Sequence, residues 1–355
     1  MLIQIKYPSL SLCRIEAPPR ESKRRLFHNH HHIISVDNLL ESWREFLRGK
    51  RRRKDVQEFS VNLTENILNL HNDLKNKTYQ HGGYTAFRIN DPKPRDIHKA
   101  SVRDRLLHHA LYRTLYPLFD KKFIFDSYSC RKDKGTHRAL NRFRLFARKV
   151  SQNHTQTAWV LKRDIRKFFT NIDHAILIKT LQKHITDPET VQVLKNVIES
   201  FCVNGKQGVG LPLGNLTSQL LINVYMNAFD HFVKRDLKAK YYIRYADDFV
   251  VIHRDRKYLE KILIQIASFL ENELKLSLHP KKVSIQTVAS GIDFLGWVHF
   301  PYHRIPRTTT KRRMFKRLVH NPKEGSFASY DGLLSHGNTY RLREGILRLL
   351  NTYIK

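Results

Sequence analysis

Residues 241–253 have the sequence YYIRYADDFVVIH, in which two runs of β-favouring residues flank a pair of acids. The first run ends at Ala246 and the second begins at Phe249, so that only Asp247 and Asp248 separate them. Two strands joined by two turn-forming residues predict a β-hairpin with both acids at its tip. Adjacent carboxylates repel each other and call for a cation nearby, although acids at a turn are often no more than turn formers.

A third acid ends a separate predicted strand upstream. Residues 158–164, AWVLKRD, predict a strand that ends on Asp164, and residues 172–185 predict the helix after it. If this strand and the hairpin lie side by side in an antiparallel sheet, Asp164 and Asp247 share a face and can hold two Mg²⁺ ions through carboxylate oxygens. Such a pair of ions activates an attacking oxygen and stabilises the leaving oxygen of a phosphoryl displacement. The acids therefore predict nucleotidyl transfer.

The charge balance predicts a polyanionic partner. The 355 residues include 64 Lys and Arg against 32 Asp and Glu, which gives a formal net charge of +32. Hydrophobic residues make up 41% of the chain and aromatic residues 11%, so disorder is excluded for most of its length. Nucleic acid is the first partner to consider.

The cysteine count and the hydropathy pattern indicate a reducing compartment. Cys13, Cys130 and Cys202 are too few and too far apart for a disulfide framework or a zinc site. The N-terminus has no signal-peptide pattern and no run of about 18 apolar residues appears, so we expect a cytoplasmic protein with no membrane partner.

Local patterns predict the remaining elements. We expect a loosely packed arm over residues 1–35, whose histidines at 28 and 30–32 are solvated and bind no metal. Periodicity predicts helices over residues 36–47, 56–77, 102–118, 216–233 and 258–274, the third of them stopped by Pro117, and strands at 84–89, 283–286 and 294–300.

Three motifs in order carry a family resemblance. Residues 245–248 (YADD) lie inside the predicted hairpin, residues 164–169 (DIRKFF) lie upstream and residues 294–297 (FLGW) lie downstream. Together they resemble the palm of a reverse transcriptase over roughly residues 80 to 300. The resemblance implies an α+β, right-hand polymerase fold with fingers, a short helical thumb and a ferredoxin-like palm, in which helices pack on an antiparallel sheet.

The same resemblance implies a division of the chain. The N-terminal arm at 1–35 would be followed by fingers with interleaved palm elements at 36–157. The palm catalytic region would occupy 158–300, and a basic helical thumb would occupy 301–355.

The resemblance also implies the active-site roles. Asp164, Asp247 and Asp248 would be the catalytic acids, and with Ile165 they would form the metal site. The cofactor would be Mg²⁺, two ions per site, for which Mn²⁺ can substitute.

Further residues match the nucleotide-binding positions of the family. Arg95 matches the arginine of the fingers that grips the incoming triphosphate, a contact that a guanidinium fork suits, and Lys93 or Arg88 would assist it. Phe169 matches the steric gate that crowds the 2′-carbon, with a plain core aromatic as the alternative. Lys282 matches a lysine near the leaving pyrophosphate, with a plain surface lysine as the alternative.

The remaining matches concern the primer and the nucleic-acid backbone. The primer grip would consist of Phe294, Leu295, Gly296 and Trp297, with its backbone and Gly296 close to the primer end. Phosphate contacts are expected from a basic run and from two arginines of the thumb, namely Lys50, Arg51, Arg52, Arg53, Lys54, Arg312 and Arg313.

One departure from the family narrows the resemblance. Residues 211–219 (LPLGNLTSQ) contain Pro-Leu-Gly and Ser-Gln where most reverse transcriptases carry Pro-Gln-Gly and Ser-Pro. This departure resembles the reverse transcriptases of diversity-generating retroelements, and residues 102–109 and 336–342 agree with it. A glutamine at this position can form hydrogen bonds around the nucleotide, whereas the Leu213 side chain makes only apolar contacts. Discrimination between correct and incorrect bases should therefore weaken, and we hypothesise that Leu213 lowers fidelity.

The implied function is an RNA-directed DNA polymerase that copies a template RNA into error-prone cDNA with mutations at template adenines. Its partners would be template RNA, the RNA/DNA hybrid, dNTPs and a small basic accessory protein oligomer. Alternatives are a retron, group II intron-like or phage-defence reverse transcriptase, or a non-catalytic RNA-binding scaffold. A nucleotide cyclase with a related palm is a remote further alternative.

Overall fold

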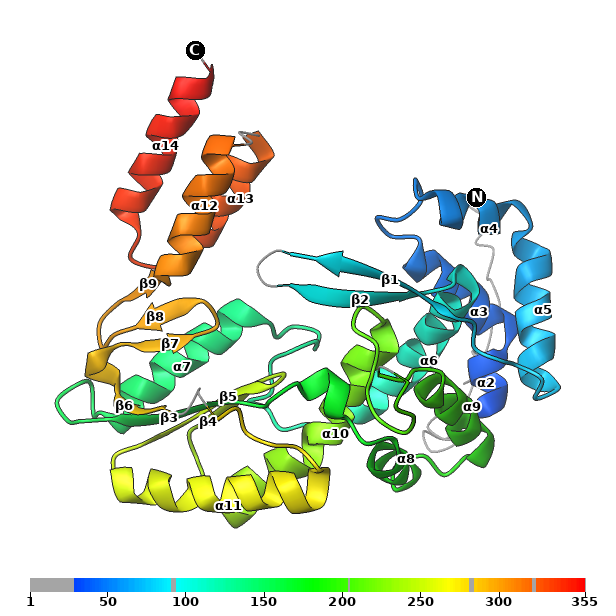
Figure 1. The fold of residues 1–355 in the computed structure, drawn as a ribbon, viewed down its shortest axis with the longest axis horizontal. Helices are drawn as coiled ribbons and strands as arrows, with labels where there is room; N and C mark the ends of the chain where they lie inside the picture. Colours follow the sequence, from blue (N-terminus) through cyan, green and yellow to red (C-terminus); the bar gives the residue numbers. More distant parts are fainter. Residues whose placement is uncertain (1–28, 91–93, 204, 281–283, 321–323, 355) are drawn as a thin grey trace, which may run out of the picture.

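An antiparallel four-stranded sheet forms the middle of the molecule (Figure 1). The computed structural model describes residues 29–90, 94–203, 205–280, 284–320 and 324–354. The strands lie in the order β4-β5-β3-β6. Their bounds are β3 (Trp159–Asp164), β4 (Tyr242–Tyr245), β5 (Asp248–His253) and β6 (Ser284–Thr287).

The sheet has the topology of a split βαβ unit used twice. Helix α10 (Leu216–His231) leads from β3 to β4, and helix α11 (Arg256–Leu274) leads from β5 to β6. Strand β5 pairs antiparallel with both β3 and β4, so it separates two strands that run in the same direction. This is the ferredoxin-like arrangement, and it agrees with the predicted fold class.

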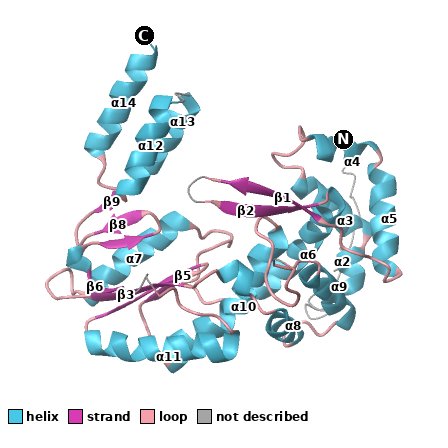
Figure 2. Ribbon diagram, in the orientation of Figure 1, coloured by secondary structure: helices cyan, strands magenta, loops and turns pink. Residues whose placement is uncertain are grey.

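Apolar side chains cover both faces of the sheet. Leu161 and Phe249 face α10 and α11 in the larger of the hydrophobic cores. Val160 and Val250 face the opposite core, which α7 (Thr136–Val150) and a second small sheet close. Figure 2 shows the helices and strands of both layers. Because successive side chains of a strand point to opposite faces, two-sided burial fixes the register of the strands.

The second sheet has three short strands. They are β7 (Ile292–Phe294), β8 (Trp297–His299) and β9 (Arg304–Pro306), in that order. The β7–β8 turn consists of Leu295 and Gly296 alone, with φ values of 51° and 85°. Positive φ at both turn positions matches the right-handed twist of a tight hairpin.

Helices and one long hairpin make up the other end of the molecule. The hairpin of β1 (Tyr84–Ile89) and β2 (Arg95–Ala100) extends from these helices towards the C-terminal part of the chain (Figure 1). The helices are α2 (His30–Ile34), α3 (Val36–Phe46), α4 (Lys54–Val61), α5 (Leu63–Lys75), α6 (Val102–Asp120), α8 (His174–Gln182) and α9 (Pro188–Glu199).

Helix α6 begins at a reciprocal cap. The Ser101 hydroxyl accepts the Asp104 N–H at 3.1 Å and donates to the Asp104 carboxylate at 2.6 Å. The prediction that Pro117 stops this helix is wrong, since α6 continues to Asp120. The proline lies in the last turn, where it removes one backbone hydrogen bond, and neighbouring residues such as Phe119 are buried.

The N-terminal predictions need three corrections. The end of the expected arm packs into the core as α2, where Ile33 and Ile34 are buried, while residues 1–28 lie outside the described part of the chain. His30 is 3% exposed, so it is not solvated. The single helix predicted over 56–77 is two helices, separated at Asn62.

The C-terminal residues form three helices with a core of their own. They are α12 (Thr308–His320), α13 (Glu324–Leu334) and α14 (Tyr340–Ile354), and Met314 and Phe327 are among the residues buried between them. The α13–α14 connection packs on the second sheet so closely that a Cβ at Gly337 would lie 2.1 Å from the Trp297 ring. None of the described helices is long and apolar enough to cross a membrane.

Candidate active site

The pairing of β3 with β5 brings the three acids together. Asp164, the last residue of β3, lies opposite Asp248, the first residue of β5. Ala246 and Asp247 form the two-residue turn between β4 and β5. The Ile165 N–H donates to the Asp247 carbonyl at 3.1 Å, so the backbone of the upstream strand directly contacts the turn.

The environment of Asp248 is electrostatically strained. Burial, together with the neighbouring negative charges of Asp164 and Asp247, raises its pKa to about 7 against the opposing effect of Lys162. The Lys162 ammonium lies 3.7 Å from the Asp248 carboxylate, whose Oδ1 is buried without a hydrogen-bond partner. A cluster of carboxylates with an unsatisfied oxygen is an environment that a cation would stabilise.

The site fits magnesium held in part by substrate. Among the described residues, no three His, Cys, Asp or Glu side chains form a ready-made metal cage. Mg²⁺ is usually bound through one or two carboxylates, water and substrate phosphates, so Asp164 and Asp247 are a sufficient donor set. The Ile165 side chain is buried and its N–H is used by Asp247, which leaves only its carbonyl as a ligand.

Backbone hydrogen bonds join the predicted nucleotide-binding residues. Phe169 lies in the 3₁₀ turn η1 (Phe168–Asn171), and its carbonyl accepts the Leu211 N–H at 2.8 Å. The Leu213 carbonyl accepts the N–H of His98 in β2 at 3.0 Å. The Phe169 ring is partly buried and packs against the larger core.

The other predicted nucleotide contacts lie near the tip of the β1–β2 hairpin or outside the described chain. Arg95 is exposed at the start of β2, on the same strand as His98. Lys93 and Lys282 lie outside the described residues.

Two of the four side chains in the predicted primer grip are buried. Phe294 and Trp297 are 0% and 3% exposed and pack in the core beside α7, so their side chains are not available to a primer. The Leu295–Gly296 turn is the part that reaches the surface. Lys162, the counter-ion of Asp248, also donates to the Asp293 carbonyl of β7 at 2.5 Å, and this bond connects the acids to the strand before the turn.

The side chains that are predicted to contact phosphates differ in how exposed they are to solvent. The side chains of residues 51–54 are exposed before or at the start of α4. Lys50 instead donates to the Phe46 carbonyl at 3.0 Å and lies over the Phe46 ring. Arg312 is exposed and Arg313 is half-buried on α12. In Figure 1, α4 and α12 lie on the same side of the molecule, with the β1–β2 hairpin between them.

The motif at residues 102–109 has a structural role that its sequence did not reveal. Asp104 is 1% exposed and accepts hydrogen bonds from the Tyr79 hydroxyl and the Gly82 N–H. Arg105 pairs with Asp55 at the start of α4. These contacts hold the base of the β1–β2 hairpin against the helices.

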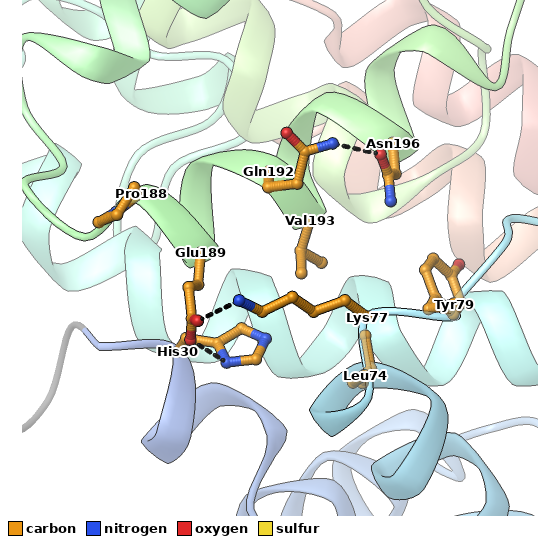
Figure 3. A pocket seen from close by; sticks show the side chains of 9 residues that line it. All are labelled: His30, Leu74, Lys77, Tyr79, Pro188, Glu189, Gln192, Val193 and Asn196. Atoms are coloured by element: carbon orange, nitrogen blue, oxygen red, sulfur yellow. Dashed lines mark hydrogen bonds and ion pairs between the residues drawn. The ribbon is translucent and has the colours of Figure 1, made fainter.

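A separate pocket of about 340 Å³ lies between α2, α5 and α9 (Figure 3). Its charged side chains are paired with one another, since Glu189 lies 2.7 Å from Lys77 and 3.1 Å from His30. These helices are at the end of the molecule opposite to β7–β9 (Figure 1). The pocket therefore contributes nothing to the acidic site.

Comparison with known proteins agrees with this geometry. Residues 89–299 match the family model described as reverse transcriptase (RNA-dependent DNA polymerase). The chain belongs to the reverse transcriptase family. The predicted enzyme class, RNA-directed DNA polymerase, is thereby confirmed at the level of the family.

Individual relatives are distant. Protein YkfC of Escherichia coli is 26% identical over 65% of this chain and 68% of its own length. The group II intron-encoded protein LtrA of Lactococcus lactis is 22% identical over 66% of this chain and 49% of its own length. A telomerase structure from Candida albicans has a TM-score of 0.52 at 11% identity, and the match covers 78% of this chain and 56% of that one. It supports the right-hand polymerase fold.

The Leu213 loop provides a test of how the β1–β2 hairpin is held. Gly214 has φ 108°, and a Cβ there would lie 2.8 Å from the Ile97 side chain of β2. We expect Gly214→Ala to lower the free energy of unfolding by about 1–3 kcal/mol, because backbone strain adds to the clash. Thermal or urea unfolding measures the loss.

Gly83→Ala is the matched control, because a Cβ at Gly83 meets nothing within 4 Å. Equal stability of the two variants would show that the loop does not hold β2.

Proposed function

We propose that the protein is an RNA-directed DNA polymerase whose catalytic acids are Asp164 and Asp247, with Asp248 completing the charge cluster. The observation that supports this proposal is the β3–β5 register, which aligns acids from two distant segments at one end of the sheet. Magnesium, when bound, supplies activation of the primer 3′-hydroxyl and stabilisation of the leaving pyrophosphate. Asp164 and Asp247 would hold it, and Mn²⁺ could substitute.

The protein's own residues position the other reactants. Arg95 on β2 is exposed and would bind the triphosphate, as Lys93 and Lys282 would. The Phe169 ring would crowd the 2′-carbon of the incoming nucleotide and so exclude a 2′-hydroxyl. The Leu295–Gly296 turn would hold the primer end, and residues 51–54 with Arg312 and Arg313 would bind phosphates of the template RNA or the RNA/DNA hybrid.

We further propose that the enzyme belongs to the diversity-generating subfamily and acts in the cytoplasm on its own template RNA. Support comes from the Pro-Leu-Gly and Ser-Gln sequences and from the placement of Leu213. The Leu213 carbonyl accepts the His98 N–H, which ties this loop to β2. Its side chain would offer the nucleotide an apolar surface in place of hydrogen bonds. A small basic accessory protein oligomer is part of this proposal on the resemblance alone.

A group II intron-like enzyme is the second candidate. The likeness to LtrA over 66% of the chain favours it. The two candidates differ in what they predict for fidelity, since only the diversity-generating enzyme is expected to misincorporate mainly at template adenines.

Primer extension on an RNA template with Mg²⁺ and dNTPs tests the proposal. We expect the protein to synthesise DNA and the Asp247→Ala variant to be inactive, because this variant lacks a metal ligand. The control variant Glu271→Gln, which changes an exposed acid of α11, should remain active. Sequencing of the product should show errors concentrated opposite adenine. Accurate synthesis would support the intron-like candidate. RNA binding without synthesis, even after cognate RNA and accessory protein are added, would support the scaffold alternative.

Leu213→Gln tests the origin of the low fidelity. The glutamine amide can hydrogen-bond around the nucleotide, so errors opposite adenine should fall by about tenfold, the effect of roughly 1.4 kcal/mol of added discrimination. Leu213→Met keeps the apolar character and serves as the control. An unchanged error spectrum in Leu213→Gln would show that this side chain does not set fidelity.

A further inference from the structure

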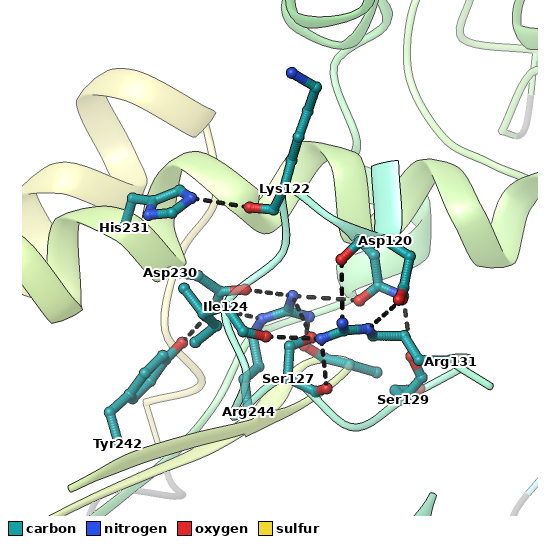
Figure 4. Close-up of polar contacts among 12 residues, drawn as sticks. Asp120, Lys122, Ile124, Ser127, Ser129, Arg131, Asp230, His231, Tyr242 and Arg244 are labelled. Atoms are coloured by element: carbon teal, nitrogen blue, oxygen red, sulfur yellow. Dashed lines mark hydrogen bonds and ion pairs between the residues drawn. The ribbon is translucent and has the colours of Figure 1, made fainter. Parts of the chain in front are cut away.

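A fully buried ion pair lies directly beneath the acidic turn. Arg244 of β4 and Asp230 of α10 both have side chains that are 0% exposed. The guanidinium donates from Nε and Nη2 to the two oxygens of Asp230, each at 2.7 Å. Figure 4 shows this guanidinium between Asp230 and Ser127, and the Tyr242 hydroxyl also donates to Asp230. Such complete burial requires that the charges satisfy each other.

The same guanidinium also reaches the turn. Its Nη1 donates to the Ala246 carbonyl at 3.1 Å. Ala246 has φ 54°, a left-handed conformation that glycine adopts more readily than alanine. The carbonyl in question belongs to the peptide group that precedes Asp247, so Arg244 fixes the orientation of that peptide group.

Asp247 is thus held from both sides by backbone contacts. The peptide before it is bound by Arg244, and its own carbonyl accepts the Ile165 N–H at 3.1 Å. The remaining Arg244 contacts, to Asn223 and Ser127 at 3.2 Å each, tie the guanidinium to α10 and to the segment before α7. The guanidinium cannot shift without breaking several hydrogen bonds.

We propose that Arg244 is a positioning residue that, anchored by Asp230, holds the Ala246–Asp247 turn in the conformation from which Asp247 acts. The inference rests on the proposed role of Asp247. Lysine cannot replace Arg244, because an ammonium cannot bind both oxygens of Asp230 in a planar fork and still donate to the Ala246 carbonyl.

Arg244→Lys tests this role, assayed below its own unfolding midpoint. We expect kcat for primer extension to fall by about 10- to 100-fold, because a displaced ligand misaligns the reacting groups. The Mg²⁺ concentration for half-maximal rate should rise, while KM for dNTP stays unchanged. Adding Ala246→Gly to Arg244→Lys should restore part of kcat, since glycine adopts the turn conformation without support.

Arg131→Lys is the matched control. Arg131 is a second buried guanidinium of the same region, bound to Asp120 and to backbone carbonyls but not to the turn (Figure 4). The Arg131→Lys variant should have a lower thermal midpoint, with the kcat and the Mg²⁺ requirement unchanged. If Arg244→Lys fails to fold, Asp230→Asn takes its place in the test. It weakens the anchor and keeps the guanidinium, so it should give an intermediate loss of kcat.

The outcomes separate the two claims. If Asp247→Ala is inactive while Arg244→Lys has the kcat and Mg²⁺ requirement of Arg131→Lys, the positioning role is wrong and the proposed active site stands. If Asp247→Ala retains full activity, the proposed active site is wrong. Two results together would also overturn the positioning role. Ala246→Gly would fail to restore kcat, and the loss of kcat in Arg244→Lys would equal the fraction of that variant that is unfolded.

Discussion

The site depends on the antiparallel register between β3 and β5. Shifting the pairing by one residue would turn every side chain of β3 to the other face and would separate Asp164 from Asp248. The register is held because both faces of the sheet are buried, with Leu161 in one core and Val160 in the other. The arrangement of the acids is therefore a consequence of packing along the strand as much as of the acids themselves.

Backbone hydrogen bonds extend this constraint into the proposed nucleotide-binding region. Phe169 is bonded to Leu211, and Leu213 is bonded to His98 of β2, so the turn after β3, the Pro-Leu-Gly loop and the hairpin form one connected frame. Main-chain bonds do not depend on side-chain identity. The hydrogen bonds of the frame therefore do not require a particular side chain at position 213.

The sequence predicted features encoded locally and missed those that depend on tertiary contacts. The β4–β5 hairpin and the strand ending at Asp164 follow from alternating patterns beside turn residues. The burial of His30 depends on Glu189 and the burial of Arg244 on Asp230, and neither partner is adjacent in sequence. The sequence of residues 294–297 likewise does not show that Phe294 and Trp297 are buried, because their neighbours in the core come from distant segments such as α7.

The most direct test of the account is a double-variant cycle on the two proposed metal ligands. Single-turnover rates of Asp164→Asn, Asp247→Asn and the double variant would be compared on one RNA template, after folding is verified. If both carboxylates hold the same magnesium, either single loss disables the site, and the double variant is no slower than the slower single variant. Losses that multiply would show that the two acids act independently and would contradict the account.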